Sequence, residues 1–230
     1  MERNITQKNR KWFYISMVVL LFLISSVVRS ILAIQNASRF VLYDELLHWQ
    51  IGESLFASGK ITFRGYALPY TEVLYSLYIS ICHIFKDGLT AYRVALTLNA
   101  IAMSSAVFPI YWMANRMTKN RKLSLFVSLL GTLAAELCLS LRIMQDTLYF
   151  PLVIGFFCYF SFVINKERIR IIDLFGLASY AFLCSLCKQI AWNLIIGMII
   201  FLAYSFLLDK KKWKTIVLQT VVFLGTFCAW

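Results

Sequence analysis

The stretch WFYISMVVLLFLISSVVRSILAI, residues 12–34, decides the class of this protein. A helix needs about 20 mostly apolar residues to cross a bilayer, because lipid tolerates only a backbone that is hydrogen-bonded within its own segment. A basic segment with Arg3, Lys8, Arg10 and Lys11 precedes the run. A secretory signal peptide is the competing interpretation, but the run is longer than a typical signal core and no small-residue cleavage site follows it. We therefore predict a retained membrane anchor.

Similar apolar runs follow one another along the chain. Apolar residues make up 60% of the sequence and charged residues 15%, against about 45–50% and about 25% in soluble domains. The sequence predicts an all-α polytopic transmembrane bundle that forms a single domain, residues 1–230. Further spans are expected over residues 92–115, 123–141, 148–164, 171–187, 190–208 and 215–230. Because the last run reaches Trp230 without a flanking charge, we expect an N-terminal part of a longer protein.

The basic residues predict the orientation. The net charge is +12, and 15 of the 23 Lys and Arg residues lie in four segments, 1–11, 116–122, 165–170 and 209–214. All four segments fall on one side if residues 72–85 do not cross, and basic loops stay in the cytoplasm. The sequence thus predicts a multi-pass protein of the cell membrane with a cytoplasmic N-terminus. No basic face with interleaved aromatics is apparent, which argues against nucleic-acid binding.

An external loop is expected over residues 35–90. Within it, Tyr43 to Ser58 is typical of an amphipathic juxtamembrane helix that Gly59 ends. Residues 72–85 are apolar and rich in Tyr but short for a span, so we predict an interfacial or re-entrant helix. Arg29 lies near the outer end of the first span, where it is expected to extend to the membrane surface.

Two adjacent carboxylates, Asp44 and Glu45, open this external helix. One can serve as a base while the other binds a metal ion or a hydroxyl. The competing interpretation is a solvated helix N-terminus, where acidic residues favour the helix dipole. Cys184 and Cys187 are spaced like a redox or metal pair, but inside an apolar run the simpler interpretation is packing on one helix face.

The next two external turns also carry ionisable groups. Asp146 follows Arg142 by four residues, a spacing that allows a simple ion pair or, alternatively, a shared role with Asp44 in one cavity, with Arg142 near a phosphate. Lys188 lies between two apolar spans, where a cation is costly unless it is paired. Glu136, inside the third span, is a candidate of the same kind. We expect the three turns to meet in one outward-facing cavity suited to a lipid-linked anionic substrate.

Five motifs follow one another in chain order: Tyr43–Asp44–Glu45 with Gly59, Tyr66–Ala–Leu–Pro69–Tyr70, Lys86–Asp87–Gly88 with Arg93, Arg142–Ile–Met–Gln–Asp146, and Leu186–Cys–Lys188. Their order resembles the N-terminal half of GT-C glycosyltransferases, in particular protein O-mannosyltransferases and the aminoarabinose transferases of lipid A. The sequence departs from the family where relatives carry paired prolines, here Leu68–Pro69–Tyr70, and where a glycine follows the lysine, here Gln189.

The resemblance implies inverting transfer of a sugar from a polyprenyl-phosphate donor to a hydroxyl of a glycan, lipid or protein, outside the cytoplasm. It implies that Asp44 is the general base, that Glu45 orients the acceptor or assists a metal ion, and that Asp146 binds acceptor or metal. The donor phosphate and the rest of the substrate would be bound by Arg93, Arg142, Lys188 and His48.

Cofactor and function are left partly open by the sequence. A divalent metal ion is optional, with Asp44 and Asp146 as its ligands. A transporter or flippase of lipid-linked sugars is one alternative function, and its signature would be broken helices with buried charges at the membrane midplane. An inactive, truncated membrane remnant that binds a partner is the other.

Overall fold

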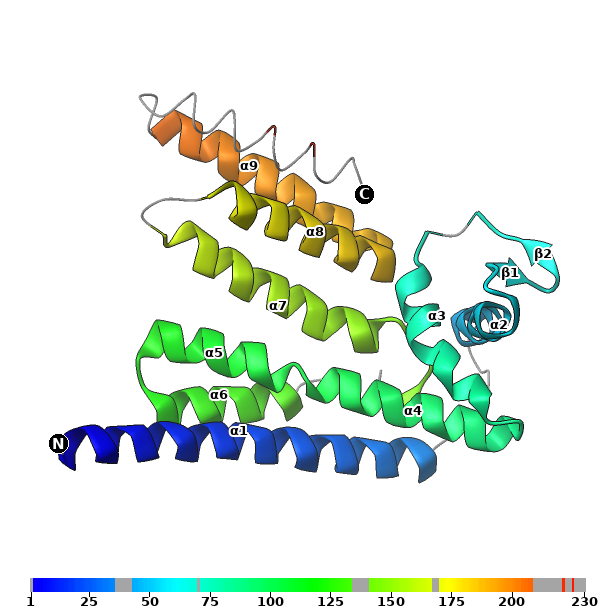
Figure 1. Cartoon of the computed structure of the whole chain (residues 1–230), viewed down its shortest axis with the longest axis horizontal. Helices are drawn as coiled ribbons and strands as arrows, with labels where there is room; N and C mark the ends of the chain where they lie inside the picture. The colour runs from blue at the N-terminus through cyan, green and yellow to red at the C-terminus, as the bar shows by residue number, and fades with distance from the viewer. Residues whose placement is uncertain are drawn as a thin grey trace.

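The computed structural model describes residues 2–35, 43–69, 71–133, 141–166, 170–208, 221 and 225. These residues are almost all helical, which confirms the predicted all-α fold (Figure 1). The elements are α1 (Glu2–Gln35), α2 (Tyr43–Ser58), β1 (Thr62–Phe63), β2 (Tyr66–Ala67), α3 (Val73–Ser80), η1 (Ile81–Ile84), α4 (Gly88–Ser104), α5 (Val107–Thr118), α6 (Arg121–Leu133), α7 (Asp146–Ile164), α8 (Ile171–Cys187), η3 (Gln189–Ala191) and α9 (Trp192–Leu208).

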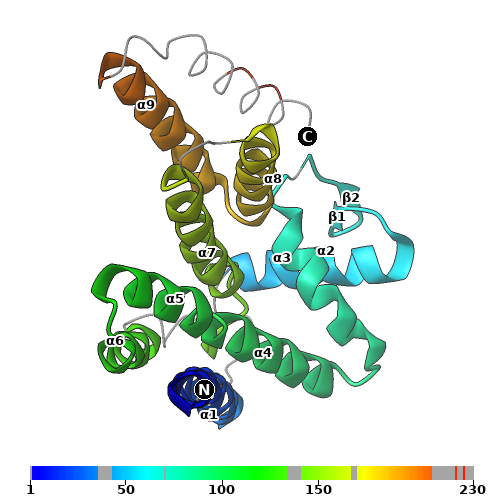
Figure 2. The same ribbon diagram turned by 60° about the vertical axis from the view of Figure 1, so that its left-hand side comes forward.

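The long helices run back and forth between two ends of the molecule. The start of α1 and the turn between α5 and α6 lie at one end, called here the N-terminal end (Figures 1 and 2). The opposite end, called the loop end, holds α2, the β1–β2 hairpin, α3, the start of α7 and the turn from α8 to α9. This alternation places α2 and the start of α7, which carry Asp44, Glu45 and Asp146, at the loop end and the basic turn between α5 and α6 at the N-terminal end.

Three helical stretches among the described residues are long and apolar enough to cross a membrane: Trp12–Gln35, Gly88–Thr118 and Asp146–Ile164. Ile171–Cys187 and Gln189–Phe201 are apolar but shorter. Large apolar side chains point outward on α1, as lipid-facing helices require; examples are Leu23, Val27 and Ile31. The predicted span 215–230 lies outside the described residues except for Val221 and Gly225, and residues 134–140 of the predicted span 123–141 lie outside them too.

The span predicted over residues 92–115 lies within the candidate span Gly88–Thr118. Inside it the chain forms two helices, α4 and α5, with a short break at residues 105–106. Pro109 has no amide hydrogen for the Ser105 carbonyl, and its ring would clash with that carbonyl in a continuous helix. The backbone turns more tightly instead, and the Phe108 amide donates to the Ser105 carbonyl over 3.1 Å. Pro109 then occupies the first turn of α5, where proline is tolerated.

Arg29 does not extend to the membrane surface as expected. Its side chain is 3% exposed and points into the bundle, where its guanidinium donates to the Thr132 carbonyl of α6 and to the Ser25 hydroxyl. The Ser25 hydroxyl in turn lies 2.9 Å from the Ser104 hydroxyl of α4. A charge inside an apolar bundle is tolerated when polar partners surround it. Arg29 therefore links α1 to α6 and, through Ser25, to α4.

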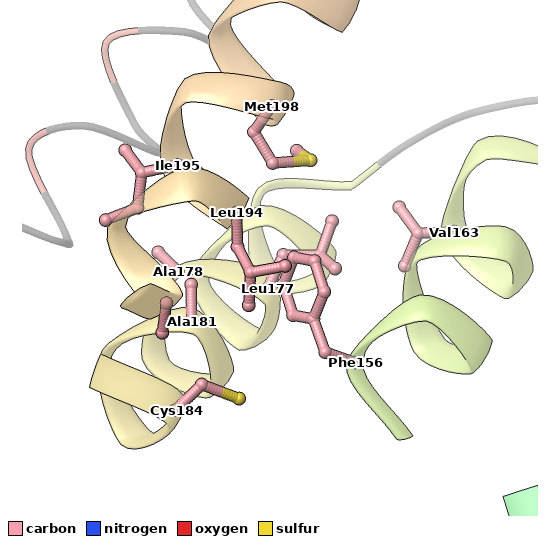
Figure 3. Packing of buried hydrophobic residues seen from close by; sticks show 10 residues of the cluster. Phe156, Val163, Leu177, Ala178, Ala181, Cys184, Leu194, Ile195 and Met198 are labelled. Carbon is pink, nitrogen blue, oxygen red and sulfur yellow. The ribbon is translucent and has the colours of Figure 1, made fainter. Parts of the chain in front are cut away.

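An apolar cluster joins α7, α8 and α9 (Figure 3). Phe156 of α7 packs with Leu177 of α8 and Leu194 of α9. Cys184 belongs to this cluster, whereas Cys187, one turn further on, packs in a second cluster with Tyr75 and Tyr92. Both cysteines are buried among apolar side chains, as the packing interpretation predicts.

Two glycines let α7 and α8 approach closely. A Cβ atom built on Gly155 of α7 would lie 2.2 Å from the Tyr180 hydroxyl of α8. Reciprocally, a Cβ on Gly176 of α8 would lie 2.5 Å from the Tyr159 hydroxyl of α7. Each glycine thus forms the socket for a tyrosine of the other helix, and small residues play this role wherever helices pack in lipid.

We predict that Gly155→Ala destabilises the folded protein by about 1–3 kcal/mol, the usual cost of overpacking. Tyr180→Phe in the same chain removes the clashing oxygen and should restore most of the loss, because the next ring atom is 3.3 Å away. Thermal unfolding in detergent micelles measures the effect. Gly197→Ala in α9, where a Cβ meets no atom within 4 Å, is the matched control; an equal loss in both variants would refute the socket.

Candidate functional site

Helix α2 carries the first candidate residues and packs against α3 at the loop end (Figure 2). The predicted bounds of this helix are confirmed, and Gly59 ends it with a positive φ of 67°. Its predicted amphipathic character is wrong, because the buried face carries Glu45 and His48 beside Ile51. This face can be polar because α4 offers a hydrogen-bonding group to Glu45 and α3 offers one to His48.

The paired carboxylates Asp44 and Glu45 point to different surroundings. Asp44 is exposed, whereas Glu45 is fully buried, since successive residues of a helix project about 100° apart. The Oε1 atom of Glu45 accepts hydrogen bonds from the Ile143 amide over 3.1 Å and from the Tyr92 hydroxyl over 3.3 Å. Glu45 therefore holds α4 and the second of the turns predicted to be external against α2, and Asp44 is left at the surface.

Asp146 and Lys188 form an ion pair between the second and third of the turns predicted to be external. Arg142 and Asp146 do not lie on one helix as the four-residue spacing suggested, because α7 begins only at Asp146 and the residues before it are not α-helical. Asp146 lies at the N-terminus of α7 and Lys188 at the C-terminus of α8, so each charge also favours its helix dipole. Both side chains keep about a quarter of their surface exposed, 24% and 28%.

The two predicted arginines differ in position. Arg142 is half-buried, interacts with the Tyr92 hydroxyl, and its carbonyl accepts a hydrogen bond of 2.7 Å from the Asn99 side chain. Arg93 is exposed, and its neighbour Tyr92 faces the site instead. Of the two, Arg142 alone belongs to the hydrogen-bonded group around Glu45.

His48 lies on the buried face of α2 and is 1% exposed. Its Nδ1 atom is 3.1 Å from the Ser76 hydroxyl of α3, and its ring packs edge-on against Tyr75. Burial lowers the pKa of His48 from 6.5 to about 4, although the nearby Asp146 carboxylate opposes the shift. At neutral pH the imidazole is therefore uncharged.

The three turns that carry Asp44 and Glu45, Arg142 and Asp146, and Lys188 are joined at the loop end. That they form one outward-facing cavity for a substrate stays a prediction. Glu45 bonds to the second turn, Asp146 of the second turn pairs with Lys188 of the third, and the Gln189 amide of the third donates to Glu72 over 2.9 Å. Glu136 lies outside the described residues.

Sequence reasoning missed Tyr75, Tyr92 and Asn99 at this site. The Tyr75 hydroxyl donates to Asn99 over 3.0 Å, which extends the hydrogen bonds from α3 through α4 to the second turn. A side-chain amide inside an apolar span indicates interhelical hydrogen bonding. Asn99, inside the predicted span 92–115, could have been found in this way. The two tyrosines had no such signal, because tyrosine is common throughout this segment.

The described residues do not fit a divalent metal ion at Asp44 and Asp146. The carboxylate of Asp146 is taken up by the Lys188 ammonium, and a cation at that position repels a second cation. Within the described part of the chain, no three His, Cys, Asp or Glu side chains gather as a metal site. We assign no metal-dependent step.

Comparisons of the chain with protein-family models, with curated proteins and with solved structures give no match.

We predict that Glu45→Ala destabilises the fold by about 1–3 kcal/mol, because it leaves the buried Ile143 amide without its acceptor. Thermal unfolding in micelles measures the loss, and Asp44→Ala is the adjacent, exposed control that should unfold like the native chain. Equal stability of Glu45→Ala and the native chain would show that the buried carboxylate holds nothing in place.

The lowered pKa of His48 predicts how the stability of the fold depends on pH. The unfolded chain takes up a proton on this ring near pH 6.5, whereas the folded chain does so only near pH 4. Stability from this group is therefore complete above about pH 6.5 and falls as the pH drops toward 4. Titration of the imidazole signals by NMR, assigned with His83→Gln, should give a midpoint near 4; a midpoint near 6.5 would contradict the burial.

Proposed function

We propose that this chain is a multi-pass membrane glycosyltransferase, or the N-terminal part of one, with its N-terminus in the cytoplasm. It would move a sugar from a polyprenyl-phosphate donor to an acceptor hydroxyl at the extracytoplasmic surface, with inversion. The observation that carries the proposal is the cluster at the loop end. There the exposed carboxylate of Asp44 lies on α2 beside Glu45, which binds the Ile143 amide of the second turn.

The distribution of charge supports the orientation. The turn from α5 to α6 holds Arg116, Lys119, Arg121 and Lys122 and lies at the same end as the start of α1. Basic segments of this kind remain in the cytoplasm. The loop end then faces outward. Trp12 of α1 and Trp112 of α5 are both partly exposed, and tryptophan suits the level where lipid meets water.

The chemistry follows from the groups at the loop end. Asp44 would accept the proton of the acceptor hydroxyl, and the hydroxyl oxygen of the acceptor would attack the anomeric carbon of the donor. The bond from that carbon to the phosphate oxygen breaks on the opposite side, which inverts the configuration. Lys188 and Arg142 would neutralise the leaving phosphate. Because Lys188 pairs with Asp146, the donor phosphate would compete with that carboxylate for the ammonium.

The proposed role of Glu45 changes from catalysis to positioning. Its carboxylate is buried and engaged by Ile143 and Tyr92, so it is unsuited to reach an acceptor. It sets the position of Asp44 indirectly, since the two residues share the first turn of α2.

A transporter or flippase of lipid-linked sugars is the second candidate, and one observation favours it. The break between α4 and α5 lies beside Ser104, which bonds to Ser25, and Ser25 bonds to the buried Arg29. Discontinuous helices beside buried polar groups mark substrate pathways in transporters. Flux of labelled lipid across vesicles, without a covalent product, would distinguish this function.

We predict that Asp44→Asn abolishes sugar transfer, because the amide cannot take up the proton, and that it leaves folding and membrane insertion unchanged. Glu53→Gln removes an exposed carboxylate from the same helix and should transfer sugar like the native chain. Transfer from a labelled polyprenyl-phosphate sugar by membranes measures both. Undiminished transfer by Asp44→Asn would remove Asp44 from the mechanism.

A further inference from the structure

We propose that a crevice between α1 and α5 at the N-terminal end binds one anionic phospholipid of the cytoplasmic leaflet, with the phosphate against Arg121. The inference rests on the proposed membrane orientation and is independent of sugar transfer. The crevice has a volume of about 420 Å³.

The walls of the crevice are apolar. Ile15 and Val19 of α1 face Phe108 and Trp112 of α5 across it. Ile15 and Val19 are also part of the outward apolar surface of α1, so the crevice is continuous with the surface that lipid would cover. An acyl chain is the ligand that such a surface accepts, and this favours a lipid over a soluble phosphate compound.

The crevice is polar at one place only. Arg121 at the start of α6 lines it together with Tyr111 and Asn115, and Arg121 lies close enough to Tyr111 to interact electrostatically. A guanidinium presents planar, paired N–H donors that match a phosphate, and an amide and a phenol can add further hydrogen bonds. The crevice thus joins a phosphate-binding group to an acyl-binding wall.

The charges around the crevice complement an anion. The described residues that line it include no acid, and Arg121 takes part in neither ion pair of the described chain. Arg116 lies over the ring of Trp112, with its Cζ atom 5.3 Å from the ring centroid. Lys119 and Lys122 of the same turn are exposed. A phosphate at Arg121 would lie in a basic segment and would meet no carboxylate among the described residues that line the crevice.

The position of the crevice in the bundle agrees with a lipid of the cytoplasmic leaflet. The crevice runs along α5 from Phe108 to Asn115, and Arg121 lines it at the start of α6. The turn between α5 and α6 lies at the N-terminal end of the bundle (Figures 1 and 2). In the proposed orientation this is the cytoplasmic side, where anionic lipids attract basic segments. The occupant is therefore a lipid such as phosphatidylglycerol, with its head group at the turn and one chain between α1 and α5.

The test is lipid binding by the full chain in detergent micelles, measured by native mass spectrometry. The probes are phosphatidylglycerol, phosphatidylcholine with the same acyl chains, and inorganic phosphate. We expect one tightly retained phosphatidylglycerol, and about fivefold weaker retention in Arg121→Gln, the effect of one basic residue near a lipid head group. Lys119→Gln removes the same charge from the same turn without touching the crevice and should bind like the native chain.

A second variant tests the wall without changing charge. Ile15→Trp should fill the crevice and displace the lipid while Arg121 remains. Equal retention of the two phospholipids, an equal loss in Lys119→Gln and Arg121→Gln, or undiminished binding by both Arg121→Gln and Ile15→Trp would overturn the proposal. Binding of inorganic phosphate alone at Arg121 would also overturn it, since the acyl chain would then play no part. Failure of the membrane proposal is a separate result: the chain would then stay in solution without detergent.

Discussion

The carboxylate of Glu45 is buried at the loop end, and the arrangement of the site depends on it. A buried carboxylate must accept hydrogen bonds, because its desolvation would otherwise destabilise the fold strongly. The Ile143 amide and the Tyr92 hydroxyl supply them. Those two donors come from the segment that precedes α7 and from α4, so satisfying one side chain of α2 brings three distant segments together. The exposed position of Asp44 follows from this constraint, because a helix cannot bury both neighbours on one side.

Ion pairs hold the α7–α8 pair at both of its ends. Asp146 pairs with Lys188 at the loop end, and Lys166 pairs with Asp173 at the other. Between them, the glycine sockets let the two helices approach closely. The helix pair is thus fixed along its length, and the loop-end ion pair carries groups that a substrate can address. A phosphate would bind the Lys188 ammonium in place of Asp146. Until a substrate binds, Asp146 neutralises this ammonium.

Local features of the fold were predictable from sequence, and long-range partnerships were not. The bounds of α2 and α8 follow from Gly59 and from the end of an apolar run at Lys188. The break near Ser105 was missed because its cause, Pro109, lies inside a run whose hydropathy does not change. One of the two interpretations paired Asp146 with Arg142, four residues away, whereas the structure pairs it with Lys188, which is 42 residues away. Hydropathy and helical spacing report only on neighbours in sequence, and a buried network selects its members across the fold.

The account depends most directly on the two ends of the bundle facing opposite sides of a membrane, with the site outside. Single cysteines placed by Glu53→Cys in α2 and by Lys119→Cys in the α5–α6 turn, in a chain without its native cysteines, test this with a membrane-impermeant maleimide. Both side chains are exposed, so accessibility within the protein is not limiting. The account predicts labelling at position 53 in intact cells and labelling at position 119 only after the membrane is opened. The reverse pattern, or equal labelling of both positions in intact cells, would contradict it.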